Sequence, residues 1–168
     1  HESLNMAGVW DLPVIYIVEN NKYGMGTSIE RASAAPDMVT KALAYAMKPV
    51  QVDGMNVVEV YDATKAAIAA IHAGEGAQFL EVITYRYEGH SMGDPLRYRT
   101  KDEVEKWRGD DPIGILERLI FDEKAASKEE LESIDEEVDK TIQEAVDFAE
   151  KSPFPALESL FDNIYVDG

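Results

Sequence analysis

The sequence predicts an α/β fold in which a doubly wound, mostly parallel sheet is followed by a helical tail. Short apolar, β-branched runs alternate with helical stretches over residues 1–100, and this order is typical of a parallel sheet with helices on its faces. Over residues 101–168 the strand patterns stop, and amphipathic helical patterns replace them. We therefore expect one α/β domain, with residues 101–168 as its helical extension.

Three short strands are expected in the first part of the chain. Residues 13–18 form an apolar, β-branched run, which is typical of a central strand covered on both faces. Residues 49–52 are the second strand, and Asp53-Gly54 ends it. Residues 79–87 are rich in β-branched and aromatic side chains and form the third.

Helices are expected before and between these strands. Residues 1–10 have the pattern of the middle of an amphipathic helix, and residues 37–47 are a second helix. The alanine-rich stretch 57–73 is apolar on all sides, so we expect it to pack on the sheet. Gly74 and Gly76 end it.

Helix-capping signals divide the tail. Thr100–Glu103 and Ser127–Glu130 both have the spacing of a capping box, and Asp111-Pro112 places a capping residue before a first-turn proline. The last capping box opens a long helix with acidic residues around one apolar stripe. This stripe consists of Leu131, Ile134, Val138, Ile142, Val146 and Ala149.

Composition excludes several classes of function. Thirty-three acidic residues against 16 basic ones give a net charge of −17, which would repel nucleic acid and anionic membranes. The chain has no cysteine, so disulfides, thiolate metal sites and cysteine nucleophiles are excluded. Residues 12–18 are the longest apolar stretch and are too few to span a bilayer. We expect a protein that binds neither nucleic acid nor membranes.

Two polar loops follow predicted strands, where ligands bind in open α/β sheets. The loop 19–28 contains Asn20 and Asn21 and then a glycine-bearing stretch, whose neutral oxygens suit Mg²⁺. The same residues are also typical of plain turns, and this interpretation stays open. No P-loop, GxGxxG motif, HExxH motif or nucleophile elbow accompanies these loops.

The loop 88–100 contains His90, which can donate to a diphosphate or act as an acid. Arg97 and Arg99 are expected to supply forked donors for anionic groups. Asp94-Pro95 predicts a turn, and Arg86, within the third predicted strand, is expected to make a buried ion pair. Together the two loops indicate a magnesium–diphosphate site.

Five stretches of the chain carry a resemblance to a known family. The chain resembles, over essentially its whole length, the alpha subunit of the two-chain pyruvate dehydrogenases, which belong to the thiamine-diphosphate-dependent 2-oxo acid dehydrogenases. The stretches are Glu19–Ser28, Val52–Met55, Thr84–Pro95, Tyr98–Thr100 and Asn163–Val166.

The resemblance implies the thiamine-diphosphate-binding fold, of which residues 1–100 would be only the C-terminal part. Its metal motif should begin with a Gly-Asp-Gly segment just upstream of His1, so we expect the chain as given to be inactive alone. Within the chain, the Asn21 side-chain oxygen and the Tyr23 backbone carbonyl would bind Mg²⁺, and Gly24 and Met25 would line the cofactor.

The same resemblance implies roles for the second loop. His90 would contact the diphosphate of thiamine diphosphate and assist the reaction with the lipoyl acceptor. Ser91 occupies the position that kinases phosphorylate in mitochondrial members, where phosphate would add charge beside that diphosphate.

The implied function is the oxidative decarboxylation of pyruvate and transfer of the acyl group to the lipoyl group of E2, the lipoyl acyltransferase. The E1 beta subunit would supply a catalytic glutamate in an α2β2 heterotetramer. Residues 24–28 favour pyruvate over branched-chain 2-oxo acids or acetoin. A non-catalytic acidic interaction domain remains the alternative from another class. The bacterial cytoplasm is the expected compartment, with the mitochondrial matrix and plastid open.

Overall fold

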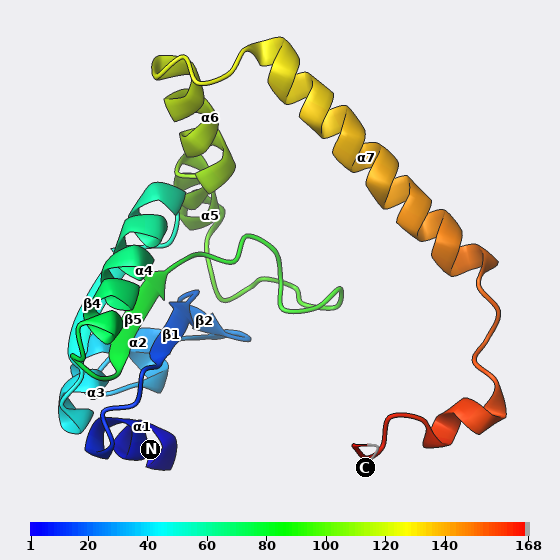
Figure 1. Cartoon of the computed structure of the whole chain (residues 1–168). Coiled ribbons are helices and arrows are strands. Elements are labelled where there is room, and N and C mark those ends of the chain that lie inside the picture. Colours follow the sequence, from blue (N-terminus) through cyan, green and yellow to red (C-terminus); the bar gives the residue numbers. More distant parts are fainter. Residues whose placement is uncertain (167–168) are drawn as a thin grey trace. The chain divides into compact units, whose positions relative to one another are not determined.

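The computed structural model describes residues 1–166 (Figure 1). The chain divides into two compact units, one from His1 to Leu119 and one that begins at Ile120. The first unit contains the sheet, and the second contains a long helix. Within the described residues, no helix is both long enough and apolar enough to cross a membrane.

The sheet of the first unit is parallel and has three strands. β1 (Ile15–Asn20) and β4 (Lys48–Asp53) both pair with β5 (Gln78–Ile83), in the order β1-β5-β4. The chain therefore passes from β1 to β4, which leaves the place between them open, and then returns to fill that place with β5. Because such crossovers are right-handed, the helices of the two connections lie on opposite faces of the sheet. The predicted α/β class is confirmed.

The position of β1 differs from the prediction. Residues 13–18 were expected to form a central strand, but β1 lies at an edge of the described sheet and Ile17 is 58% exposed. The central strand is β5, in which Phe79, Leu80 and Glu81 are buried. An apolar run shows which strands have apolar faces, but it does not show which strands lie beside them, so among the three described strands the central place belongs to β5 and not to β1.

The third strand is shorter than predicted. Its ladder ends at Ile83, which pairs with Asn20 of β1 on one side and with Asp53 of β4 on the other. Both neighbours end there, so residues 84–87 leave the sheet despite their strand-like composition. Gly54 packs against the end of β5, where residues 84–87 leave the sheet. A Cβ atom at Gly54 would come within 2.6 Å of the Ile83 carbonyl oxygen.

Helices cover both faces of the sheet. α1 (Glu2–Val9) was predicted and packs with α3 (Val39–Ala42) over the start of the strands, whereas α4 (Val57–His72) contacts β4 and β5. The Asn56 side chain caps α4 by accepting hydrogen bonds from two backbone N–H groups. One apolar cluster joins α1, α3 and the sheet, and its buried members are Ala7, Ala42, Met47, Ala77 and Phe79.

The helix predicted over residues 37–47 is broken. α3 is followed by a 3₁₀ turn, η1 (Leu43–Tyr45), and then by Ala46 in the left-handed region with φ of 58°. This conformation turns the chain so that the Met47 N–H donates to the Ala42 carbonyl at 3.2 Å and Met47 becomes buried. Packing of Met47 in the core therefore overrides the local helical pattern.

The tail contains α5 (Lys101–Gly109), α6 (Pro112–Asp122), α7 (Lys128–Lys151) and η2 (Leu157–Phe161). Asp111 Oδ1 caps α6 by accepting from the Ile113 N–H at 2.9 Å, as predicted. The capping box at Ser127 and Glu130 is also confirmed, with bonds of 3.2 and 2.8 Å.

The capping box predicted at Thr100 forms only in part. The Thr100 hydroxyl accepts from the Glu103 N–H at 3.2 Å, but the Glu103 carboxylate does not return to Thr100. It accepts hydrogen bonds from Tyr23 and Tyr85 instead, which are far away in the sequence. A long-range contact therefore replaces half of the local motif.

Candidate functional site

A tight hairpin follows β1 at the carboxyl edge of the sheet. β2 (Tyr23–Gly24) and β3 (Thr27–Ser28) are antiparallel, and α2 (Ile29–Ala32) comes directly after them. The turn between the strands is Met25-Gly26, with Met25 at φ of 55°. Gly26 packs closely here, because a Cβ atom would lie 3.0 Å from the Tyr98 ring and the ring would have to shift by a few tenths of an ångström.

Both asparagines of this loop make turns. Asn20 Oδ1 accepts from the Lys22 N–H at 3.1 Å, and Asn21 Oδ1 accepts from the Tyr23 N–H at 3.2 Å. The plain-turn interpretation is therefore correct for the local structure. It does not exclude a metal, because an amide oxygen has a second lone pair. Asn21, Tyr23 and Gly24 all line a hollow of about 220 Å³.

A buried carboxylate in the central strand supports the loop 19–28 through hydrogen bonds. Glu81 in β5 is fully buried and accepts hydrogen bonds from Asn20 Nδ2 at 2.7 Å, Gln51 Nε2 at 3.1 Å and the Val39 N–H at 3.1 Å. Burial alone raises the pKa of Glu81, but these hydrogen bonds outweigh it and leave the pKa below its usual value. Glu81 is thus ionised at neutral pH.

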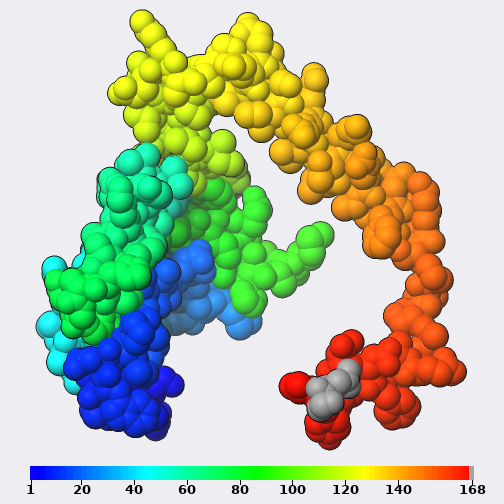
Figure 2. Space-filling model, in the orientation of Figure 1, coloured from blue at the N-terminus to red at the C-terminus, as the bar shows by residue number. Residues whose placement is uncertain are grey.

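The second loop is organised around Asp94. Its Oδ2 atom accepts from the Tyr98 hydroxyl at 2.6 Å and the His90 N–H at 2.9 Å, and Oδ1 accepts from the Leu96 N–H at 3.0 Å. The predicted turn is present, since the Asp94 N–H donates to the Ser91 carbonyl at 3.0 Å. Figure 2 shows this part of the first unit, in green, standing out from the residues around it.

Arg86 joins the two loops. Its Nη2 atom donates to the Met25 carbonyl at 2.9 Å, and Nη1 lies 3.4 Å from His90 Nδ1. The buried ion pair predicted for Arg86 is absent from its contacts in the described structure, because Arg86 lies beyond the end of β5 and binds neutral acceptors. Since a guanidinium only donates, Nδ1 of His90 accepts and Nε2 carries the proton.

His90 and the hairpin face a common hollow. It has a volume of about 490 Å³, and Met25 and Gly26 line it from one side. The exposed side chains of His90, Ser91 and Arg97 line it from the other. A hollow with one imidazole N–H donor and one guanidinium is suited to an anionic group.

Arg99 points away from this hollow. Its guanidinium is buried, donates to the backbone carbonyls of Arg86, Tyr87 and Glu88, and lies 5.3 Å from the Tyr85 ring. The expectation that Arg99 binds an anionic ligand is therefore wrong. Its two Nη groups hold the backbone that leads into the second loop, whereas its buried Nε has no hydrogen-bond partner among the described residues.

An aromatic cluster around Glu103 fixes both loops to α5. Glu103 Oε1 accepts from the Tyr23 hydroxyl at 2.8 Å and the Tyr85 hydroxyl at 2.9 Å. Trp107 stacks on Tyr85, with ring centroids 5.0 Å apart and planes at 6°. Burial, followed by the bond to Glu103, raises the pKa of Tyr23 to about 12. From the sequence, only a capping role was predicted for Glu103, with its carboxylate bonded to the Thr100 N–H instead.

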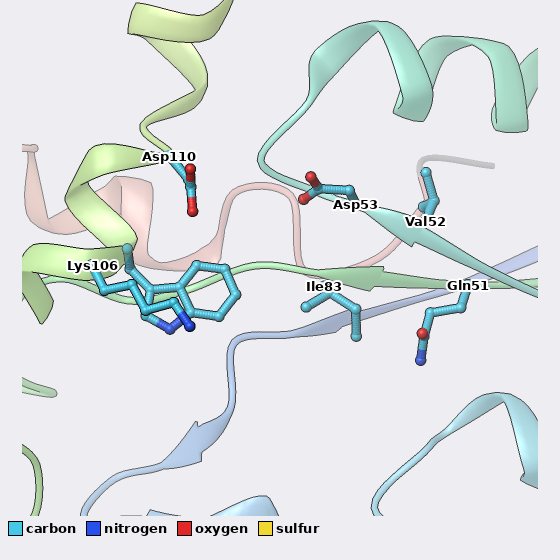
Figure 3. A pocket seen from close by; sticks show the side chains of 7 residues that line it. Gln51, Val52, Asp53, Ile83, Lys106 and Asp110 are labelled. Atoms are coloured by element: carbon cyan, nitrogen blue, oxygen red, sulfur yellow. The ribbon is translucent and has the colours of Figure 1, made fainter. Parts of the chain in front are cut away.

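A third hollow lies at the carboxyl ends of β4 and β5 (Figure 3). It measures about 430 Å³, and Asp53, Lys106 and Asp110 line it. Asp53 Oδ1 already accepts from the Met55 N–H at 2.9 Å in a local turn. None of the residues that the sequence singled out as cofactor-binding lies there.

The metal-binding potential of the chain rests on neutral oxygens. Within residues 1–166, no three His, Asp or Glu side chains gather closely enough to hold a metal ion. The Asn21 side-chain oxygen and the Tyr23 carbonyl are hard oxygen donors of the kind that suit Mg²⁺, which takes its other ligands from phosphates and water. The residues present therefore fit a magnesium–phosphate group, but only as part of a larger ligand set.

Comparison with known proteins assigns the family. The sequence profile of the family described as "Dehydrogenase E1 component" matches residues 1–158. The chain belongs to this family. Relatives within it that are named pyruvate dehydrogenase E1 component subunit alpha include one from Rickettsia conorii, 42% identical over 98% of this chain, and one from Rhizobium meliloti, 46% identical over 98% of it. A rice relative named as the chloroplastic subunit alpha-3 is 40% identical over 99%.

This E1-family chain spans about half the length of its curated relatives, covering 51% of the Rickettsia conorii protein and 47% of the Rhizobium meliloti protein. The predicted resemblance is confirmed by these matches. The roles assigned to Asn21, Tyr23, Gly24, Met25 and His90 stay predictions.

Proposed function

We propose that this protein acts in the alpha subunit of a two-chain pyruvate dehydrogenase E1 enzyme. The subunit would form an α2β2 heterotetramer with the beta subunit, decarboxylate pyruvate and pass the acetyl group to the lipoyl arm of E2. The observation that carries the proposal is the bond from Arg86 to the Met25 carbonyl, because it brings the Asn21 hairpin and the His90 loop together.

Thiamine diphosphate and Mg²⁺ are the proposed cofactors. Asn21 and Tyr23 would hold the metal through their oxygens, and Gly24 and Met25 would line the cofactor along the hairpin. His90 would donate its Nε2 proton to the diphosphate or to the lipoyl acceptor, with Arg86 fixing the imidazole through Nδ1. When bound, thiamine diphosphate supplies the electron sink for decarboxylation.

The experiment that tests this function is pyruvate decarboxylation by the full-length alpha subunit coexpressed with its beta subunit. Activity is expected only with both thiamine diphosphate and Mg²⁺ present. Asn21→Ala is expected to weaken cofactor binding by at least about 10–100-fold, the loss seen when even an outer-shell partner of a metal ligand is removed. His90→Ala is expected to slow acetylation of a lipoyl domain more than decarboxylation.

The control variant is Asn5→Ala, an exposed asparagine in α1 outside both loops, which is expected to leave activity unchanged. Activity on branched-chain 2-oxo acids or acetoin, with none on pyruvate, would replace the substrate assignment. Absence of cofactor-dependent turnover on any of these would leave a non-catalytic interaction domain.

A further inference from the structure

Glu81 is a charged side chain in the middle of the central strand, where an apolar residue is the usual occupant. It is fully buried, and the register of the sheet places it opposite Val18 of β1 and Gln51 of β4. An ionised carboxylate in such a position is costly unless every oxygen is satisfied by donors. The chain places three donors around it, which indicates a specific use.

The three partners of Glu81 have one property in common. Asn20 Nδ2, Gln51 Nε2 and the Val39 N–H are all donors. A carboxylate accepts at both oxygens, whereas the amide of glutamine would turn an NH2 group toward at least one of these donors. The site therefore requires an acceptor-only side chain of this length.

The hydrogen bond to Glu81 also fixes the orientation of the Asn20 side-chain amide. With Nδ2 held at 2.7 Å by Glu81, the Oδ1 atom of Asn20 is directed to the Lys22 N–H at 3.1 Å. Lys22 has φ of 70°, in the left-handed region that a lysine adopts only when its surroundings hold it there. Asn21 lies between these two residues, so its orientation depends on both of them.

We propose that Glu81 is a positioning residue for the cofactor site, which acts through Asn20 and Lys22 to orient Asn21 and Tyr23 toward Mg²⁺ and the diphosphate. This inference rests on the proposed function. The inference gives the central strand β5 a role in cofactor binding, although no atom of β5 would touch the cofactor.

The test measures binding of thiamine diphosphate at saturating Mg²⁺, and of Mg²⁺ at fixed thiamine diphosphate, by titration calorimetry on the full-length alpha–beta complex. Glu81→Gln is expected to weaken both by about 10–100-fold, the usual effect of losing a group that orients a metal ligand. The double variant Asn20→Asp with Glu81→Gln exchanges donor and acceptor, and it is expected to restore binding to within about threefold of the unchanged complex.

Two further variants separate positioning from general stability. Asn20→Ala removes the link between Glu81 and Lys22 but keeps the hydrogen bonds that Gln51 and Val39 donate to Glu81. It is expected to weaken binding of thiamine diphosphate and Mg²⁺ by about 10–100-fold while the complex still assembles. It therefore tests the proposal even if Glu81→Gln does not fold. Glu105→Gln, on an exposed carboxylate of α5, is the matched control and is expected to bind as the unchanged complex does.

The outcomes are distinct. If the unchanged complex binds no thiamine diphosphate, the proposed function fails and this inference fails with it. If the unchanged complex binds and a folded Glu81→Gln or Asn20→Ala variant binds equally well, only the positioning role is overturned. A folded double variant that binds no better than Glu81→Gln also overturns it.

Discussion

At the scale of single residues, Asp94 shows how one side chain organises a loop. It is only half-buried, yet one hydroxyl and two backbone N–H groups donate to it. The bond from Tyr98, followed by those from His90 and Leu96, lowers the pKa of Asp94 from 3.8 to about 2. Because the folded pKa is the lower one, the carboxylate stabilises the loop above pH 3.8, and this contribution is lost as the pH falls through about 2.

We therefore predict that Asp94→Asn loosens the second loop at neutral pH, because a neutral amide accepts these bonds more weakly than a carboxylate. Trypsin is expected to cleave after Arg97 several-fold faster in the variant, as followed by mass spectrometry. Asp62→Asn, on the exposed face of α4, is the control and is expected to leave cleavage unchanged. Equal cleavage of Asp94→Asn and the unchanged protein would mean that Asp94 does not hold the loop.

At the scale of elements, the two predicted capping boxes differ in outcome. At α7 the Ser127 and Glu130 side chains bond to each other's backbone N–H groups, and both bonds lie within four residues of the chain. At α5 the hydroxyls of Tyr23 and Tyr85 bond to the Glu103 carboxylate, so its return bond to the Thr100 N–H is lost while the Thr100 hydroxyl still accepts from the Glu103 N–H. A cap is reliable from sequence only where its carboxylate has no long-range partner.

Ser127→Ala is predicted to destabilise α7 by about 1 kcal/mol, the usual cost of losing such a cap. The helix has 24 residues, long enough to be studied as a peptide by circular dichroism. Ser133→Ala, inside the same helix, is the control, and it is expected to raise helicity slightly because alanine has the higher helix propensity. A loss of helicity in both peptides would show that the effect is not capping.

At the scale of the whole molecule, charge is the dominant feature. The net charge of −17 comes from 33 acidic and 16 basic residues. Among the described residues, ion pairs join exposed groups, such as Lys128 with Glu132 and Lys151 with Asp147, and pairs of this kind contribute little. Most of the excess negative charge therefore opposes the folded state through mutual repulsion.

We predict that added salt stabilises the chain. Raising NaCl from about 0.01 M to about 0.15 M shortens the screening length from about 30 Å to about 8 Å. The midpoint of thermal unfolding is expected to rise by about 2–4 °C, which corresponds to about 1 kcal/mol. Choline chloride at the same ionic strength should give the same rise, whereas a rise with NaCl alone would indicate binding of Na⁺.

Local sequence patterns were sufficient to predict the α/β class, the extent of α1 and α4, the caps of α6 and α7, and the two polar loops that follow β1 and β5. These features depend on side-chain periodicity, capping side chains and turn residues. Each of them acts over a few neighbouring residues, so the pattern in the chain is sufficient to predict them.

Four features became clear only from the folded chain: β5 is the central described strand, Arg86 joins Met25 to His90, Arg99 turns inward, and Glu81 holds Asn20. These contacts join residues as far as 61 positions apart in the chain. No local pattern encodes them, because the partner of a charged or polar side chain is fixed only when packing brings distant segments together. The residues predicted to form the site could therefore be named from the sequence, whereas the contacts that Arg86 and Glu81 make with the two loops could not.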